Sequence, residues 1–139
     1  MASTTQNLGL IKPASNENYN IDVFNENFQK IDNASAVESA SLTLASGTGV
    51  SGSLVIQRSH KYRILRGVIT LASPGTNIEV TTLQASDRPL ISIYGACTGY
   101  GISVQSEVQI DSSNGKVTIN CPNNGNTNSL KFAIPYFIG

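Results

Sequence analysis

Charged residues are scarce in this chain of 139 residues: they make up 13% of it, and nine basic side chains balance nine acidic ones. Clustered lysine and arginine are what capture nucleic acid and anionic membranes, so the composition speaks against both as partners. The sequence also has no apolar run long enough to span a bilayer, and residues 1–6 lack the character of a signal peptide. We therefore expect no membrane insertion and synthesis in a cytoplasm.

Histidine and cysteine are also scarce, with one and two copies. His60 has no nucleophile motif beside it, and the three residues do not have metal-ligand spacing. The few carboxylates after residue 40 do not suggest the paired acids of a glycosidase. We expect no catalytic residue, no metal and no cofactor, and hence no enzyme. Cys97 and Cys121 stand among apolar residues, which favours two buried free thiols, although a disulfide remains open.

One stretch is predicted clearly as helix, residues 20–32. Its apolar side chains recur at i, i+3, i+7 and i+10 and form a single stripe: Ile21, Phe24, Phe28 and Ile31. Asn20 suits the N-cap, Asp22 the first turn and Lys30 the last turn. A helix this short is marginal alone in water, so the stripe must be covered. Self-association and packing within one chain both remain open, and the four residues are a candidate oligomer interface.

The chain on either side of this helix differs in composition. Residues 1–18 are polar and contain Pro13, which predicts extended chain without a core of its own. Residues 33–40 lose the helical stripe and are typical of a linker or a frayed helix end. We therefore place a domain boundary near residue 40, with an N-terminal segment over 1–40 and a second domain over 41–139.

From residue 41 the apolar pattern changes to a period of two, which is typical of half-buried strands. The clearest hairpin pairs residues 102–110 with 117–121 around a turn in which Asn-Gly supplies the positive φ angles. Over residues 62–71 the apolar set changes parity, which predicts a bulge near Gly67. Turn signals between roughly seven short strands predict a mainly β fold, in which an antiparallel sandwich or barrel follows one short helix.

The N-terminal residues resemble a known pattern. Tail-tip and baseplate proteins from phages and phage-like particles of Gram-positive bacteria open on a motif that is similar to three stretches here: Leu8-Gly9-Leu10-Ile11-Lys12-Pro13, Tyr19-Asn20-Ile21-Asp22, and Phe24-Asn25-x-Asn27-Phe28-x-Lys30-Ile31-Asp32. In those proteins the motif marks attachment to the particle rather than any chemistry. The resemblance implies that residues 1–40 dock to a baseplate or tail protein, and that the chain leaves the bacterial cytoplasm as part of the virion.

The rest of the chain resembles, more loosely, the all-β head of phage receptor-binding proteins. The resemblance rests on size, on strand rhythm and on three short stretches: Asp87-Arg88-Pro89, Gly99 and Gly115-Lys116-Val117. It implies that three chains form a knob that grips saccharide on the host cell wall. A helix with under two heptads of Ile and Phe cannot hold three chains together by itself. In a homotrimer the heads must therefore supply most of the contact between chains.

Saccharide recognition needs aromatic rings for the C–H faces of a sugar and polar side chains for its hydroxyl groups. The chain has no tryptophan, so tyrosines must serve. Tyr100 lies between two glycines and is the first candidate, and the others are Tyr94, Arg88, His60 and Asn124. The alternative is a structural adaptor of the baseplate or tail that binds no ligand, because the N-terminal motif fits that role equally well.

Overall fold

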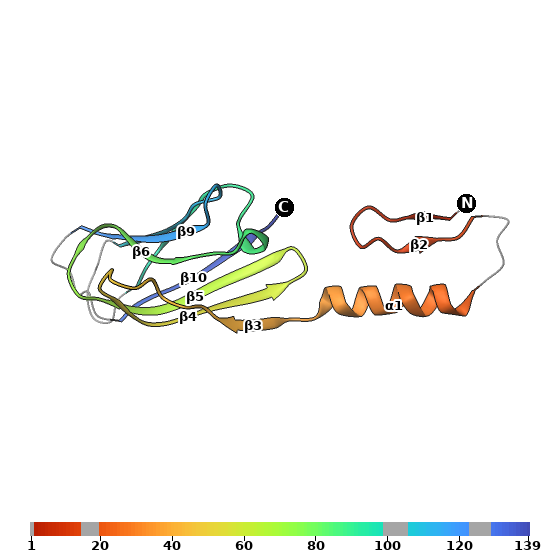
Figure 1. The fold of residues 1–139 in the computed structure, drawn as a ribbon, viewed down its shortest axis with the longest axis horizontal. Helices are drawn as coiled ribbons and strands as arrows, with labels where there is room; N and C mark the ends of the chain where they lie inside the picture. The colour runs from red at the N-terminus through yellow and green to blue at the C-terminus, as the bar shows by residue number, and fades with distance from the viewer. Residues whose placement is uncertain (1, 15–19, 99–105, 123–128) are drawn as a thin grey trace. The chain divides into compact units, whose positions relative to one another are not determined.

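A computed structural model describes residues 2–14, 20–98, 106–122 and 129–139 of the chain (Figure 1). The chain forms two compact units, Met1–Val37 and Glu38–Gly139. In the described residues no helix is long and apolar enough to cross a membrane. The two units are described separately below, and the second is called the head.

The N-terminal unit is a short hairpin held against one helix. Its elements are β1 (Ser3–Thr4), β2 (Ile11–Lys12) and α1 (Ile21–Ser35). The Asn27 side chain accepts a hydrogen bond from the Ile11 N–H (2.7 Å) and donates one to the Ile11 carbonyl (2.9 Å). Lys30 Nζ donates to the Gly9 carbonyl at 3.0 Å. The described part of the extended chain predicted over residues 1–18 is a hairpin that two polar helix side chains hold in place, a contact that was not predicted from the sequence.

Helix α1 begins as predicted and ends later than predicted. Asn20 is the N-cap, and its side-chain oxygen accepts from the Asp22 N–H at 2.8 Å. The helix continues to Ser35, so Lys30 is not in the last turn, which has no basic residue. Instead Lys30 forms an ion pair with Glu26 at 2.8 Å, one turn earlier, and reaches Gly9.

The apolar stripe of α1 lies beside the face that holds the hairpin. Half-buried positions on α1 are Val23, Asn27, Lys30 and Ala34. The stripe residues are exposed by 55% for Ile21, 44% for Phe24, 55% for Phe28 and 45% for Ile31. At roughly 100° per residue, the centre of the stripe lies about a quarter turn away from the hairpin face. The rings of Phe24 and Phe28 touch edge to face, with centroids 4.4 Å apart, so the stripe is a continuous apolar surface on the helix.

The head is an antiparallel sandwich of two four-stranded sheets. Sheet I has the order β10–β5–β4–β3, and sheet II has the order β6–β9–β8–β7. The strands are β3 (Glu38–Ser41), β4 (Val50–Ser59), β5 (Tyr62–Leu71), β6 (Gly75–Thr82), β7 (Ile93–Ala96), β8 (Glu107–Ile110), β9 (Lys116–Cys121) and β10 (Leu130–Phe137). A short 3₁₀ turn, η1 (Ala85–Asp87), connects β6 to the segment before β7.

The inner faces of the sheets form one apolar core, as the alternation of the sequence predicted. Strand β10 alternates strictly between buried and exposed residues, and β9 buries every second residue. The fully buried aliphatic side chains come from both sheets: Leu54, Ile56, Leu65, Ile69, Val80, Leu83, Val108, Ile110, Val117, Ile119 and Leu130. Cys97 and Cys121 are free thiols in this core, as the sequence favoured. The predicted turn joins β8 to β9, and Gly115 has a φ of +76°, but Asn114 does not have the positive φ that was predicted for it. Residues 102–105 of the predicted hairpin lie outside the described residues.

Main-chain bonds join the edges of the two sheets. Thr98 and Lys131 exchange two backbone hydrogen bonds of 2.8 Å and thereby attach the residues after β7 to β10. At the other edge the Ala45 N–H donates to the Val80 carbonyl at 2.8 Å, just after β3. The sandwich is therefore bridged at both edges in the manner of a flattened barrel, which limits the unpaired strand edges it presents.

Two details of the sequence prediction were wrong. Strand β5 pairs with β4 in continuous register, without a bulge near Gly67. Gly67 is needed for space instead, because a Cβ there would come within 2.4 Å of the Phe132 ring. Residues 38–40 are also not a linker, because β3 begins at Glu38 and pairs with β4, so the head starts two to three residues before the predicted boundary.

Candidate functional site

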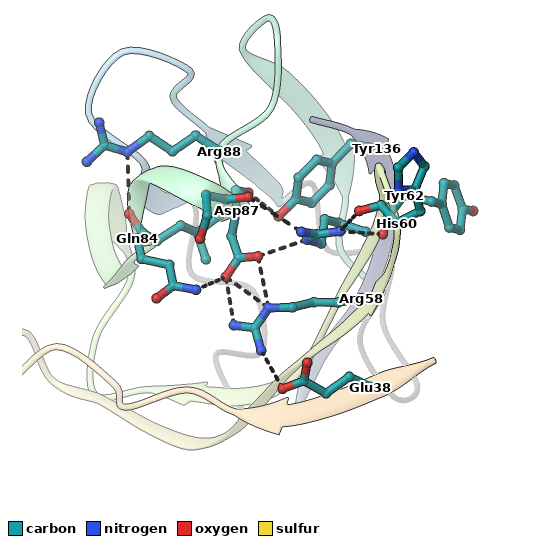
Figure 2. A network of polar contacts seen from close by, with 11 residues as sticks. Glu38, Arg58, His60, Tyr62, Gln84, Asp87, Arg88 and Tyr136 are labelled. Atoms are coloured by element: carbon teal, nitrogen blue, oxygen red, sulfur yellow. Dashed lines mark hydrogen bonds and ion pairs between the residues drawn. The ribbon is translucent and has the colours of Figure 1, made fainter. Parts of the chain in front are cut away.

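A buried carboxylate organises one end of the head (Figure 2). Asp87, at the end of η1, is 1% exposed. Arg58 of β4 approaches it with two nitrogens, Nε at 2.9 Å and Nη2 at 2.7 Å, and Arg63 of β5 approaches with Nε at 2.8 Å. Gln84 Nε2 donates a further hydrogen bond at 3.0 Å. Both carboxylate oxygens are therefore fully used by donors from the protein itself.

The surroundings of Asp87 keep it ionised. Burial alone raises the pKa of Asp87, but the hydrogen bonds from the two guanidinium groups and from Gln84 outweigh this, so the pKa lies below its ordinary value. The same hydrogen bond to Asp87 raises the pKa of Arg58. Tyr136 of β10 donates its hydroxyl to the Asp87 carbonyl at 2.8 Å. The cluster thus ties η1 to three strands of sheet I, and it has no spare acceptor with which to act on a ligand.

Two of the predicted site residues flank this cluster and are kept apart by it. Figure 2 shows His60 on one side of Asp87 and Arg88 on the other. His60 lies in the exposed turn between β4 and β5 with φ +44°, and its carbonyl accepts from Arg63 Nη1 at 2.7 Å. Arg88 is half-buried and donates to the Ser113 carbonyl at 3.1 Å, which fastens the β8–β9 turn. The main chain of His60 and the side chain of Arg88 therefore have structural roles.

A row of polar side chains crosses the outer face of sheet II. Tyr94 pairs with Gln109, Gln109 pairs with Thr118, and Thr118 pairs with Glu79, so one residue from each strand stands in line. We call these four residues the polar row. Tyr94 is 60% exposed, and its hydroxyl lies 3.4 Å from Gln109 Nε2. The row therefore begins with an open aromatic ring and continues with amide, hydroxyl and carboxylate groups.

A concavity of about 280 Å³, here called the polar pocket, overlaps the row. The described residues that line it all have polar side chains: Asn77, Glu79, Gln109, Asp111, Asn114, Lys116 and Thr118. The ion pair of Lys116 with Glu79 spans 3.3 Å. Asp111 accepts from the side chain and the backbone N–H of Ser113, at 2.6 Å and 2.7 Å, and these bonds lower the pKa of Asp111. The charges of the pocket thus have partners inside the protein.

The strand at the rim of the polar pocket is irregular. The register of β6 against β9 shifts between Gly75 and Ile78 and again between Glu79 and Thr81. Asn77 has a φ of +52°, and its N–H donates to the Asn120 side chain at 2.7 Å. Bulges re-aim side chains and are common beside functional sites. Here the two irregularities stand on either side of Glu79.

Sheet I has a larger concavity on its outer face, of about 720 Å³, here called the cationic groove. It is lined by Ser53, Val55, Gln57, Arg66, Gly67, Val68, Ala96, Thr98, Lys131, Phe132 and Ala133. Arg66 pairs across the strands with Ala133, and Lys131 pairs with Val68, so the two cations are diagonal neighbours on one face. None of the described lining residues is acidic, which makes the groove suited to a negatively charged group.

Exposed apolar side chains gather near the end of β10. Tyr62, Leu90, Ile91 and Phe137 are exposed by 37%, 65%, 74% and 64%, and we call them the apolar rim. The rings of Tyr62 and Phe137 lie 5.3 Å apart, and the Leu90 N–H donates to the Phe137 carbonyl at 3.3 Å. A contiguous surface of this kind is typical of an interface between proteins.

Comparison with known proteins gives a fold. No protein-family model and no curated protein sequence matches the chain. Among solved structures, the head domain of lactococcal phage bIL170 is similar, with a TM-score of 0.55 and 21% sequence identity. The similarity covers 75% of this chain and 100% of the phage domain, which is described among the receptor-binding domains of lactococcal phages. The chain has the fold of a phage receptor-binding head.

Within this receptor-binding-head fold, the predicted site residues do not form one cluster. Tyr100 and Asn124 lie outside the described residues. Tyr94 is exposed on sheet II, while His60 and Arg88 lie on either side of Asp87. Tyr136 is 3% exposed and belongs to the core, so its ring offers no surface to a sugar.

The sequence reasoning missed three members of the polar row as site residues: Glu79, Gln109 and Thr118. Gln109 had the signal of outward parity in an alternating strand, as Glu79 did. The strand register that brings these residues beside Tyr94 was not visible from the sequence. Within the described ranges, no group of His, Cys, Asp and Glu side chains could hold a metal ion.

Proposed function

We propose that the chain is a receptor-binding protein of a phage or phage-like tail tip, and that its head attaches the particle to saccharide on the host cell surface. One observation carries the proposal: the fold matches a phage receptor-binding head over the whole of that domain. The surface chemistry of sheet II supports a saccharide as the receptor, because it combines an exposed ring with neutral hydrogen-bonding groups.

The N-terminal unit is the proposed attachment to the baseplate or tail. Four residues of the phage-like motif are joined by hydrogen bonds: Gly9 accepts from Lys30, and Asn27 pairs with the backbone of Ile11. Gly9 also has a φ of +61°, which favours glycine. The motif therefore builds a preformed hairpin and helix, which is what a docking element needs, and the virion is the expected location of the assembled protein.

A homotrimer is the proposed assembly, with the stripe of α1 and the apolar rim as contacts between copies. The stripe has Ile21, Phe28 and Ile31 about half exposed, and the rim adds further aromatic and aliphatic surface from the head. Zero net charge also removes the repulsion that would keep copies apart. Three equivalent heads on one particle turn a weak single-site affinity into firm attachment through avidity.

A thermal-shift screen tests the proposed function. The full chain is melted with polysaccharides extracted from the cell walls of Gram-positive bacteria, because a ligand that binds only the folded state raises the melting temperature. We expect a rise that depends on ligand concentration for at least one wall polysaccharide. If none of them changes the melting temperature, the chain is better described as an adaptor of the baseplate or tail, the second candidate, which the attachment motif fits equally.

A further inference from the structure

We propose that the polar row and the polar pocket on the outer face of sheet II form the saccharide site of the head, and that the site selects neutral, hydroxyl-rich sugars. The inference rests on the proposed function and adds the place and the class of ligand. The polar row carries the argument, because four strands present one functional side chain each in a single line.

Tyr94 supplies the stacking surface. Its ring is 60% exposed, and its hydroxyl is held 3.4 Å from the Gln109 amide, so the ring is positioned before any ligand arrives. The C–H face of a pyranose packs on such a ring, while the amide beside it is free to bond the hydroxyl groups at the edge of the sugar. A ring that is already oriented loses less conformational entropy when the ligand binds.

The rest of the row supplies hydrogen bonds over a length that suits more than one sugar unit. Strands in a sheet lie about 4.8 Å apart, so the distance from Tyr94 across β8 and β9 to Glu79 is roughly 14 Å. Gln109 and Thr118 offer both donors and acceptors, and Asn77 and Asn114 add amides at the rim of the polar pocket. Planar amides and hydroxyls at this spacing match the alternating hydroxyl groups of an oligosaccharide.

Charge decides between neutral and anionic ligands. In the polar pocket, Glu79 has Lys116 as its ion-pair partner, and Asp111 is bonded within its own turn. An anionic sugar would have to compete with Glu79 for Lys116 and would meet the carboxylate of Asp111. The cationic groove of sheet I, with Arg66 and Lys131, has the opposite preference. Binding at the polar pocket therefore predicts a preference for neutral sugars, whereas binding at the cationic groove predicts a preference for anionic ones.

The experiment is an NMR titration of the ¹⁵N-labelled full chain with glucose, galactose, rhamnose and N-acetylglucosamine. Glucose 6-phosphate and glucuronate are the anionic counterparts of glucose. We expect the neutral sugars to shift the amide signals of Tyr94, Gln109 and Thr118, with weaker effects from the anionic pair. The readout reports each site separately and does not depend on the number of copies in the assembly.

Variants separate the ring from the fold. Tyr94→Ser should weaken the binding of the neutral sugars about tenfold, since an aromatic contact is worth on the order of that factor. Tyr94→Phe, which keeps the ring, should retain most of the binding. Val37→Ser is the control, because it removes an exposed apolar side chain that belongs neither to the polar row nor to the proposed contacts between copies, and it should leave the affinity unchanged.

Three results would overturn the inference. The first is a Tyr94→Ser variant that binds neutral sugars as well as the unmodified chain does. The second is a set of shifts that maps to Arg66 and Lys131 with a preference for the anionic sugars. The third is a series of titrations in which no neutral sugar shifts the polar row. If the chain still adheres to bacterial walls in those cases, the proposed function stands and only the site is wrong; if adhesion is also absent, the proposed function fails.

Discussion

Asp87 combines almost complete burial with a negative charge, a combination that costs several kcal/mol unless the charge is matched. Arg58 and Arg63 match it, and Tyr136 bonds the carbonyl of the same residue. The sequence analysis did not predict the two arginines as partners of Asp87. They are 24 and 29 residues away along the chain, and charged residues are normally assigned to the surface.

The clue to this ion pair was the change of apolar parity over residues 62–71. We interpreted it as a bulge, whereas β5 is regular and its inward position at residue 63 is taken by a buried arginine. The apolar periodicity alone does not reveal that a charged residue occupies an inward position of a strand, because the partner that neutralises its charge comes from another element of the fold.

The substitution Asp87→Ala should be among the most damaging in the head. It leaves Arg58 and the nearly buried Arg63 without their counter-charge, and breaking a buried pair in this way costs about 3–5 kcal/mol. Urea denaturation followed by circular dichroism measures the loss. Glu107→Ala, at an exposed carboxylate of β8, is the control and should change the free energy of unfolding little. Equal stability of the two variants would contradict the role given to Asp87.

The stability of the head should also fall in acid because of Asp87. Its pKa is lowered in the folded state, so its contribution is fully present above the unfolded-state pKa of about 3.9. That contribution is lost as the pH falls through the lower folded-state pKa. We expect the urea midpoint to drop below about pH 4, and Asp87→Asn to show a shallower drop. A parallel pH dependence in both proteins would argue against this assignment.

Cys97 and Cys121 should resist alkylation in the folded protein. Both thiols are buried, and burial raises the pKa of Cys97 to about 11, so the reactive thiolate is rare at pH 8. Iodoacetamide labelling, read by mass spectrometry, should modify neither cysteine until urea is added and then both. Rapid labelling of the native chain would show that the core opens near the two cysteines. Failure to label the unfolded chain would reveal a disulfide.

At the scale of single helices, strands and turns, the sequence predicted those features that depend only on residues close together in the chain. The N-cap Asn20 and the β8–β9 turn both satisfy their hydrogen bonds locally, and the structure shows both. The hairpin of residues 3–12 was missed, because its strands are two residues each and their support comes from Asn27 and Lys30 of α1. For the same reason the polar row was only partly predicted. The outward parity of a residue can be read from its own strand, whereas the register between strands depends on how the sheet is paired.

The contact between hairpin and helix can be tested through Asn27. Asn27→Ala removes two hydrogen bonds to Ile11, each worth about 0.5–1.5 kcal/mol, so the hairpin should detach more often. Hydrogen exchange of the Ile11 amide should become about tenfold faster or more. Asn25→Ala, at an exposed position of the same helix, is the matched control. An unchanged exchange rate in Asn27→Ala would mean that other contacts hold the hairpin.

For the whole molecule, the strand rhythm of the sequence was enough to predict an antiparallel sandwich or barrel, without deciding between the two. The structure shows two sheets with a shared core, and at 21% identity it is the fold rather than the sequence that connects the head with a phage domain. The sequence did not reveal which outer face carries a site. That depends on concavity and on which charges are paired, and both are properties of the assembled sandwich.

The assembly should be a trimer in solution. Multi-angle light scattering of the full chain should give three times the single-chain mass of 14.7 kDa. Phe28→Asp in the stripe and Phe137→Asp in the apolar rim place a charge on exposed apolar surface, so each should lower the mass while the circular dichroism of the head is retained. A mass of one chain for the unmodified protein would remove the avidity argument and favour the adaptor.

Adhesion to intact cells tests the central claim, that the head recognises saccharide on a bacterial surface, most directly. The fluorescently labelled full chain is incubated with a panel of Gram-positive bacteria and with the same cells after their wall polysaccharides have been stripped, and bound fluorescence is measured by flow cytometry. We predict that the chain binds at least one strain, that stripping abolishes the binding, and that the released polysaccharide competes for it. Equal binding to intact and stripped cells, or no binding to a strain that adsorbs the particle carrying this chain, would contradict the claim.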